Sequence, residues 1–382
     1  MAFNRLLIAV LTLSCSFGAP LWAQTSLPAE QEQILEESIP EEKIPGPALV
    51  QTPSKAQTPA PTPSGPPQLM MPAACALGTD CWVVNYIDTD TEKDSARDYT
   101  CGPRTYDGHD GTDFAIRDRV AMDIGVGVVA AANGRVVRVR DGQDDQQPTG
   151  EQIQTMLSSN LGCGNGVLID HGNGWQSISC HMKKGSITVK PNQPVRAGER
   201  IGEIGQSGAA EFPHLHFSLF KGGTIIDPFS GEAIDGGCGG TPKPLWLMGL
   251  TLPYEPVALY AGGFTPGEPV LDGLRIDATG AATVRADAPA LSFWVGIYGV
   301  REGDVIHMTI TDPLGRPFAS RAITQDKTRA RQFYYVGRKV RGTLMPGPYT
   351  GTLTLERTGD GVTTETISRA LERMVTVTSV EP

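Results

Sequence analysis

Long apolar runs, histidines and clustered positive charge are all scarce in this chain. Its apolar run near the N-terminus, residues 6–13, is far shorter than the roughly 20 apolar residues that cross a bilayer, and no other segment is long enough. The 382 residues carry 32 Lys and Arg against 42 Asp and Glu, a formal net charge of −10. This balance argues against a non-specific grip on nucleic acid or on anionic lipid. We therefore expect no nucleic-acid partner and no membrane span.

The N-terminal part of the chain is typical of an exported protein. Arg5 precedes the apolar run, and small residues lead to Ala23, which predicts a signal peptide over residues 1–23. Residues 24–72 are rich in Pro, Gln, Glu, Thr and Ser. This composition cannot bury a core, so a Pro-rich disordered linker is expected there.

Six cysteines follow the predicted signal peptide, and no Cys-x-x-Cys spacing occurs among them. An even number in an exported chain predicts disulfides rather than a cysteine-ligated metal. A hairpin turn at Gly172-Asn173-Gly174 would bring Cys163 opposite Cys180, so we expect that pair, and the other four stay unassigned. The signal, linker and disulfides together favour a periplasmic or secreted protein of a Gram-negative envelope.

Two globular units are expected after the linker, because 382 residues exceed one ordinary domain. Residues 73–243 alternate short β runs with glycine turns, which predicts a mostly β unit. Its long polar excursion, residues 141–165, predicts a surface loop with a helical piece beside a cleft. Residues 244–382 show alternating strands and tight turns, typical of an antiparallel immunoglobulin-like β-sandwich. The expected strands are 82–87, 126–131, 135–140, 167–170, 175–179, 214–220, 292–298, 305–311, 331–336 and 349–355.

Two of the six histidines, His214 and His216, are separated by one residue. On a strand both would point from the same face. Upstream, His109 and Asp113 flank Gly111, and an extended backbone would again place all three on one face. Nitrogen from two histidines and oxygen from a carboxylate suit zinc, with a fourth position open for water.

Several motifs occur in a fixed order along the chain: His-x-Gly-x-Asp at 109–113, the run 167–174, Cys180-His181-Met182, the run 195–205, His214-Leu215-His216-Phe217 and Ile226-Asp227-Pro228. Together they resemble the lysostaphin-type, or LytM-type, zinc endopeptidases of peptidoglycan. The resemblance covers about residues 105–230. It implies an antiparallel catalytic sheet in which His109, Asp113 and His216 hold Zn²⁺.

The resemblance also gives roles to the remaining histidines of the motifs. It implies that His181 and His214 face the open coordination position as catalytic residues. Paired histidines can relay a proton to a leaving amine. The implied substrates are peptidoglycan peptides, either cross-links or stem peptides, and the bond between D-alanine and a diamino acid is favoured. Tyr106 is expected to lean into the cleft.

Other readings are weighed against this hypothesis. A non-catalytic wall-binding or hydrolase-activating protein is the rival, with the C-terminal sandwich as its working part or as the surface for a protein regulator. His171 is expected to be structural, and His307, alone on a strand, is given no role. Ser207 in Gly-Gln-Ser-Gly-Ala lacks the context of a nucleophile elbow. The acidic run 88–92 is expected to be a solvated turn rather than a calcium loop.

Overall fold

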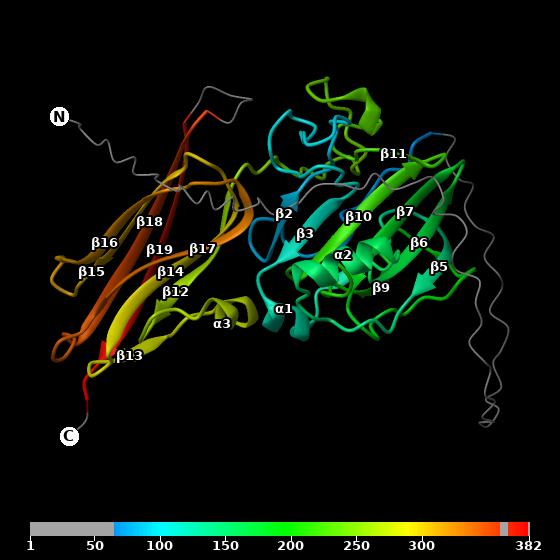
Figure 1. Ribbon diagram of the computed structural model, residues 1–382. Helices are drawn as coiled ribbons and strands as arrows, with labels where there is room; N and C mark the ends of the chain where they lie inside the picture. The colour runs from blue at the N-terminus through cyan, green and yellow to red at the C-terminus, as the bar shows by residue number, and fades with distance from the viewer. Residues whose placement is uncertain (1–64, 360–365, 381–382) are drawn as a thin grey trace, which may run out of the picture.

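The computed structural model describes residues 65–359 and 366–380. It is built mainly from antiparallel strands, which confirms the predicted mostly β class. Two units lie side by side, with β2 to β11 in one and β12 to β19 in the other (Figure 1). The predicted signal peptide and most of the predicted linker fall outside the described residues. No helix among the described residues is long and apolar enough to cross a membrane.

The first unit holds short strands, two α-helices and a 3-10 turn. They are β1 (Ala73–Ala74), β2 (Cys81–Asn85), β3 (Thr112–Ile116), α1 (Arg119–Ile124), β4 (Gly127–Val129), β5 (Gly134–Arg140), α2 (Gly150–Ser158), β6 (Asn165–Gly172), β7 (Trp175–Met182), β8 (Pro194–Val195), β9 (Arg200–Glu203), β10 (His214–Lys221), β11 (Thr224–Ile225) and η1 (Ile234–Gly236).

One large sheet organises this unit. Its strand order is β2-β3-β10-β7-β6-β5-β8, with β11 paired to β10, and β1-β4-β9 form a separate small sheet. Every residue of β2 and β3 is buried, and β10 is buried over most of its length. Because β3 and β7 both pair with β10, Asp113 on β3 and Cys180 on β7 both lie opposite His216 at the centre of this sheet.

The helix expected in the polar excursion is present as α2. Thr149 caps it, since its hydroxyl accepts a hydrogen bond from the backbone of Gln152 while the Gln152 side chain accepts one from the backbone of Thr149. The stretch before α2 is fixed to the sheet by Asp145, whose Oδ1 accepts a hydrogen bond from the Gln206 backbone at 2.7 Å. The excursion is therefore anchored beside the segment that leads into β10.

The second unit consists of strands and one short helix. They are β12 (Ala258–Thr265), α3 (Leu271–Ile276), β13 (Thr283–Arg285), β14 (Ala290–Val300), β15 (Val305–Thr311), β16 (Pro317–Thr324), β17 (Arg329–Lys339), β18 (Gly347–Thr358) and β19 (Thr366–Thr378).

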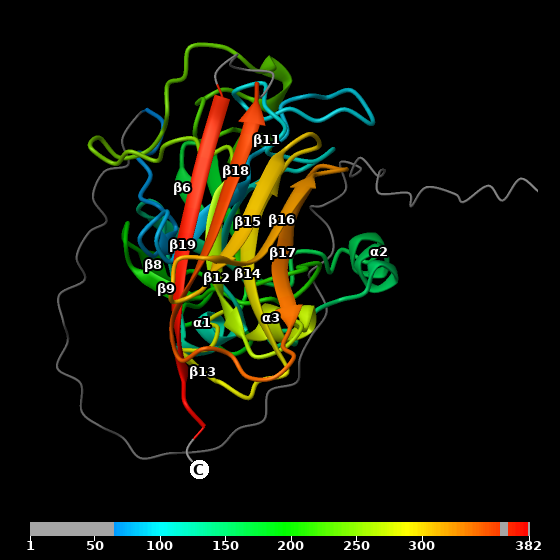
Figure 2. The same ribbon diagram turned by 90° about the vertical axis from the view of Figure 1, so that its left-hand side faces the viewer.

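These strands form two sheets packed on a shared core. The orders are β12-β14-β17 and β13-β19-β18-β15-β16, and in Figure 2 the strands β19, β18, β15 and β16 lie side by side nearest the viewer. Apolar residues of both sheets, such as Phe293 on β14 and Leu353 on β18, are fully buried in one cluster. The unit is thus a β-sandwich, and its immunoglobulin-like type stays a prediction.

The ends of the first unit reach beyond the predicted boundaries. Leu69, which lies in the predicted linker, is fully buried, and its backbone N–H donates to Leu245 at 2.8 Å. Trp246, predicted to belong to the second unit, packs in the first core. Burial of these large apolar side chains explains why the chain stays on the first unit on both sides of the predicted limits.

The two units share an apolar contact rather than a loose linker. Trp82 and Ala115 of the first sheet cluster with Tyr260 and Tyr298 of the sandwich. The Tyr298 hydroxyl donates to the backbone carbonyl of Ile116 at 3.1 Å. Because Ala115 and Ile116 lie on β3, the sandwich supports the strand that also carries Asp113.

Candidate metal centre

Strands β3 and β10 place Asp113 and His216 side by side. The two residues are register partners, and Nδ1 of His216 lies 3.0 Å from Oδ1 of Asp113. Nε2 of His109 lies 3.2 Å from the same oxygen. The three ligand atoms all lie within 4.8 Å of one another. Three side chains from distant parts of the sequence therefore converge on one point.

His109 reaches this point from a turn and not from a strand. We expected 109, 111 and 113 to share a strand face, and this was wrong because β3 begins only at Thr112. The backbone N–H of His109 donates to the Tyr106 carbonyl at 3.0 Å. The Asp88 carboxylate holds the same turn by accepting from the Gly108 N–H at 2.9 Å. The density of Gly and Asp in this segment favours such a turn.

Gly111 gives His216 the space that it occupies. A Cβ atom at position 111 would lie 2.4 Å from Nε2 of His216, a distance that no real contact tolerates. The glycine predicted to leave room between the ligands does so, although the room is taken by the imidazole of His216.

Hydrogen bonds select the atom that each side chain presents to the centre. Nδ1 of His109 lies 2.6 Å from the Tyr86 carbonyl, which can only accept, so Nδ1 carries the proton. Nε2 of His109 is then the unprotonated nitrogen, and it is buried without a hydrogen-bond partner. Asn85 donates to Oδ2 of Asp113 at 2.8 Å, which leaves Oδ1 for the centre. A buried, unpartnered lone pair is what a metal ligand requires.

The electrostatics of the centre favour a cation. Burial would lower the pKa of His216, but hydrogen bonds to the carboxylates of Asp110 and Asp113 outweigh it and raise the pKa to about 10. Burial would raise the pKa of Asp113, but the neighbouring His109 and His214 hold it well below its usual range. The carboxylates that favour a proton on His216 would equally favour a metal ion there. Two nitrogens and one oxygen form a donor set that zinc accepts.

His181 and His214 lie beside the three converging side chains. Their ring centroids are 4.6 Å apart, and Nε2 of His214 is 3.6 Å from Oδ1 of Asp113. Nδ1 of His181 lies 2.8 Å from the Ser207 carbonyl, and Nδ1 of His214 lies 2.8 Å from the Phe212 carbonyl. Burial lowers the pKa of both imidazoles, that of His181 most. Both rings therefore favour the neutral form, in which Nδ1 donates to the facing backbone carbonyl and Nε2 carries the lone pair.

The backbone of His181 is unusual for a strand residue. Its φ angle is 59°, in the left-handed region that side chains other than glycine seldom adopt. The conformation is held because its N–H donates to the Cys163 carbonyl at 2.8 Å and its carbonyl accepts from Gly205 at 3.0 Å. The pairing of β6 with β7 shifts register between Asn165 and Val167, close to this point. Such local strain is typical of functional sites.

Comparison with known proteins places this geometry in a family. Residues 107–228 match the sequence description of Peptidase family M23. This segment is a peptidase M23 domain. The resemblance to lysostaphin-type enzymes predicted from the motifs is thereby confirmed for the first unit.

Individual relatives match over less than a third of this chain. Peptidoglycan DD-endopeptidase ShyA of Vibrio cholerae is 35% identical over 119 residues, which is 31% of this chain and 22% of that protein. Cell division protein DipM of Caulobacter vibrioides is 29% identical over 114 residues, 30% of this chain and 17% of that protein. The matched part thus spans about a fifth of each relative. The catalytic domain of lysostaphin from Staphylococcus simulans is 25% identical, with 32% of this chain and 76% of that chain covered and a TM-score of 0.23.

The remaining candidates from the sequence fall outside the centre or at its rim. The ring of Tyr106 lies 4.5 Å from that of His109 and is 54% exposed. His171 is buried with Nδ1 2.9 Å from the Asn133 carbonyl and Nε2 2.8 Å from the Ser177 hydroxyl, so both nitrogens are engaged. His307 is exposed on β15 in the sandwich.

Two further sequence motifs have structural uses. Ser207 is fully buried, and its hydroxyl donates to the Met182 carbonyl at 2.8 Å, so it is no exposed nucleophile. The acidic run at 88–92 folds on itself, since the Asp88 carboxylate accepts from the backbone N–H groups of Asp90 and Arg97, each at 3.0 Å. Asp88 and Thr89 are buried, so this part of the run is not the solvated turn that we expected.

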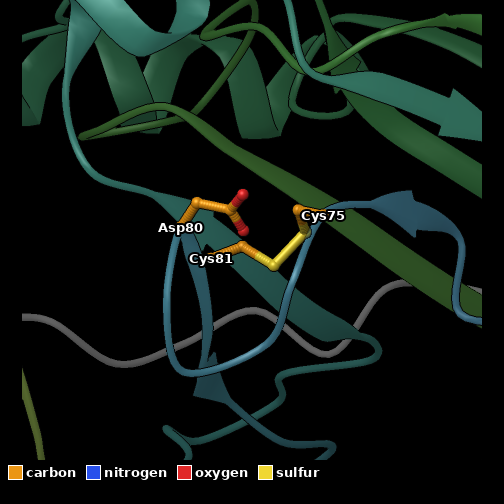
Figure 3. Close-up of side chains that lie close together, drawn as sticks. All are labelled: Cys75, Asp80 and Cys81. Atoms are coloured by element: carbon orange, nitrogen blue, oxygen red, sulfur yellow. A yellow bond between two sulfur atoms is a disulfide. The ribbon is translucent and has the colours of Figure 1, made fainter.

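Three disulfides join the six described cysteines. The pairs are Cys163–Cys180, as predicted, together with Cys75–Cys81 and Cys101–Cys238. Cys75 and Cys81 also lie beside Asp80, as Figure 3 shows. This second group is no metal centre, because both sulfurs are consumed in the disulfide. The Asp80 carboxylate instead accepts the N–H of Ala76 at 2.6 Å.

Sequence reasoning missed the residues that orient the candidate ligands. Asn85 and Tyr86 at the end of β2 hold Asp113 and His109, and Asp88 holds the turn before His109. No motif marks them, because each acts through a hydrogen bond to a residue some 20 to 30 positions away. Asp110 is the exception, since it stands beside His109 in the sequence, and its Oδ1 lies 3.1 Å from Nε2 of His216.

Proposed function

We propose that this protein is an exported zinc metalloendopeptidase that hydrolyses peptide cross-links or stem peptides of bacterial peptidoglycan. The observation that carries the proposal is the convergence of His109, Asp113 and His216, with a buried and unpartnered Nε2 on His109. The printed name of the Vibrio cholerae relative, a peptidoglycan DD-endopeptidase, supports the substrate class.

Nε2 of His109, Oδ1 of Asp113 and Nδ1 of His216 would hold the ion. Bound zinc supplies Lewis-acid activation of water and of the scissile carbonyl. The side chain of Asn85 keeps Asp113 in place, and the Tyr86 carbonyl fixes the tautomer of His109. This support presents all three donor atoms before substrate arrives.

His181 and His214 would carry the proton chemistry of the reaction. Both are neutral near pH 7, because burial lowers the pKa of each ring. Their Nδ1 atoms donate to backbone carbonyls, so Nε2 is the atom that would accept a proton from the attacking water and pass it to the leaving amine. The imidazolium formed in this step, through its N–H at Nε2, would also stabilise negative charge on the scissile carbonyl oxygen.

The N-terminal features and the relatives favour the Gram-negative periplasm as the working compartment. Three disulfides in the described part of the chain suit an oxidising compartment. The sandwich could also be the surface that binds a protein regulator, and this is proposed as a secondary role of that unit.

Elemental analysis and muropeptide release test the proposal together. Wild-type protein should contain one zinc per chain and release peptides from purified sacculi, whereas His216→Ala should lose both. His307→Ala is the matched control, since it removes an exposed histidine of the sandwich and should retain both properties. Equal release by wild type and His216→Ala would defeat the enzyme hypothesis and favour a wall-binding or activating protein. Mass analysis of the released fragments would identify the scissile bond.

A further inference from the structure

A cavity of about 170 Å³ lies between the M23 domain and the sandwich. The end of β2 and the segment 103–106 form one wall, and Gly299 to Arg301 with the start of β17 form the other. Four arginines line it, namely Arg104, Arg301, Arg329 and Arg357. Among the described residues that line the cavity none is acidic, although acidic residues outnumber basic ones in the whole chain.

Two of these arginines have donors that nothing in the protein satisfies. Arg104 is 4% exposed, and its Nε and Nη1 atoms are buried without a hydrogen-bond partner. Nη1 of Arg301 and the hydroxyl of Thr105 are in the same condition. Arg357 differs, because Asp304 pairs with it through two contacts of 2.7 Å. A buried donor of a charged group costs free energy when it makes no hydrogen bond. The number of such donors here therefore indicates a ligand with acceptor atoms.

The cavity adjoins the metal centre. Asn85 lines the cavity and also donates to Asp113 at 2.8 Å. Tyr106 lines it as well, and its exposed ring lies 4.5 Å from the ring of His109. A peptide that passes over Tyr106 could therefore engage the metal centre and the cavity at once.

We propose that this interdomain cavity is a subsite for a carboxylate of the peptide substrate, read by Arg104 and Arg301. The inference rests on the proposed function for the identity of the substrate. Guanidinium groups bind carboxylates through short, charge-assisted hydrogen bonds that often come in pairs. Peptidoglycan peptides carry free carboxylates, whereas an amide in the same place would offer one uncharged oxygen acceptor in place of two charged ones. The sandwich thereby supplies part of substrate recognition.

Binding to a peptide with and without that carboxylate tests the proposal. The His216→Ala protein serves as background, because it should not cleave the ligand, and calorimetry gives the affinity. The carboxylates of a synthetic stem peptide are amidated one at a time, and amidation of the one carboxylate that the arginines bind should weaken binding roughly tenfold. Arg301→Gln should weaken binding of the unmodified peptide by a similar factor. Applied together they should weaken binding no more than either does alone, because both remove one interaction.

Additive losses, or no loss, would overturn the proposal. Inorganic phosphate alone binding as tightly as the peptide, with no effect of amidation, would also overturn it and indicate a site for free anions. Arg373→Gln is the control, since Arg373 is exposed on β19 outside the cavity, and it should bind both peptides as the background does. Arg104→Gln is a second variant, and its thermal unfolding would show whether it still folds.

These results separate the subsite from the catalytic proposal. Cleavage of sacculi by wild type together with peptide binding that ignores Arg301 would leave the enzyme in place and remove the subsite. Carboxylate-dependent binding without any cleavage of sacculi by wild type would keep the subsite and remove the proposed enzyme activity.

Discussion

One hairpin of the M23 domain holds two histidines in opposite ways. Near the turn between β6 and β7, both ring nitrogens of His171 are engaged by Asn133 and Ser177. At the open end of the same hairpin, His181 adopts a left-handed backbone and lies 4.6 Å from the His214 ring. His109, nearby, presents a buried nitrogen without a partner. The sheet is the same, so the difference lies in what is left unsatisfied.

The comparison teaches that unmet hydrogen-bonding capacity, rather than histidine content, marks the functional end. A buried polar group without a partner costs free energy, and folding keeps few of them. At the turn end of the hairpin, His171 does not have this cost, because both of its ring nitrogens have partners. At the open end, the buried Nε2 of His109 has no partner, and it lies with ring nitrogens of His214 and His216 around one carboxylate oxygen of Asp113.

Replacing His181, one of the two histidines proposed to relay protons, should give the largest effect, and a small effect would contradict the comparison. His181→Ala should keep its zinc but lose roughly 10²- to 10⁴-fold in peptide release, the range for general acid-base groups. Zinc content and release rates are measured on the same preparation. Loss of the metal in this variant would show that the ligands are misassigned.

Asp227 offers a second comparison with the candidate metal centre, because it is a buried carboxylate that lies away from that centre. Burial raises its pKa to about 6, although the Phe229 N–H donates to it. A raised carboxyl pKa favours the folded state at low pH, and this contribution is lost as pH rises from about 4 through about 6. Asp227→Asn should therefore gain about 3 kcal/mol over wild type between these pH values.

Urea unfolding of both proteins at pH 4 and pH 7 measures that difference. A chelator is included so that metal binding does not add its own pH dependence. An equal pH slope in the two proteins would mean that Asp227 titrates normally in the folded state.

Much of the fold and of the centre could be predicted from local sequence pattern. Period-two spacing placed His214 and His216 on one face, and the structure has both on β10. The Gly-Asn-Gly turn predicted the Cys163–Cys180 disulfide, which is present. Such features depend on neighbours a few positions away, which a sequence displays directly.

The rest depends on contacts between distant segments. Asp88 sits in an acidic run that looks like a solvated turn, yet its carboxylate fixes the turn before His109. The left-handed backbone of His181 follows from its hydrogen bonds to Cys163 and Gly205, which no local pattern encodes. The arginines of the interdomain cavity come from both units and meet only when these pack together.

Removing the support of a ligand should have a smaller effect than removing a relay residue. Asn85→Ala takes away the donor to Oδ2 of Asp113. Zinc affinity should fall roughly 10- to 100-fold, as is common for such outer partners. Competition with a chelator of known affinity measures it, and unchanged affinity would show that Asp113 needs no such support.

The smallest effect is expected at the satisfied end of the hairpin. His171→Ala leaves the Asn133 carbonyl and the Ser177 hydroxyl without a partner, which should cost about 2 kcal/mol of unfolding free energy. Activity per folded molecule should stay at the wild-type level. A loss of peptide release in protein that is fully folded would show that His171 takes part in catalysis, and the two ends of the hairpin would then not differ in function.

The most direct test of the central claim is an anomalous difference map at the zinc absorption edge from crystals of the purified protein. The account predicts one strong peak per chain, bounded by Nε2 of His109, Oδ1 of Asp113 and Nδ1 of His216, at roughly 2.0–2.2 Å from each. A peak at any other group of residues, or none in crystals grown with zinc, would contradict it.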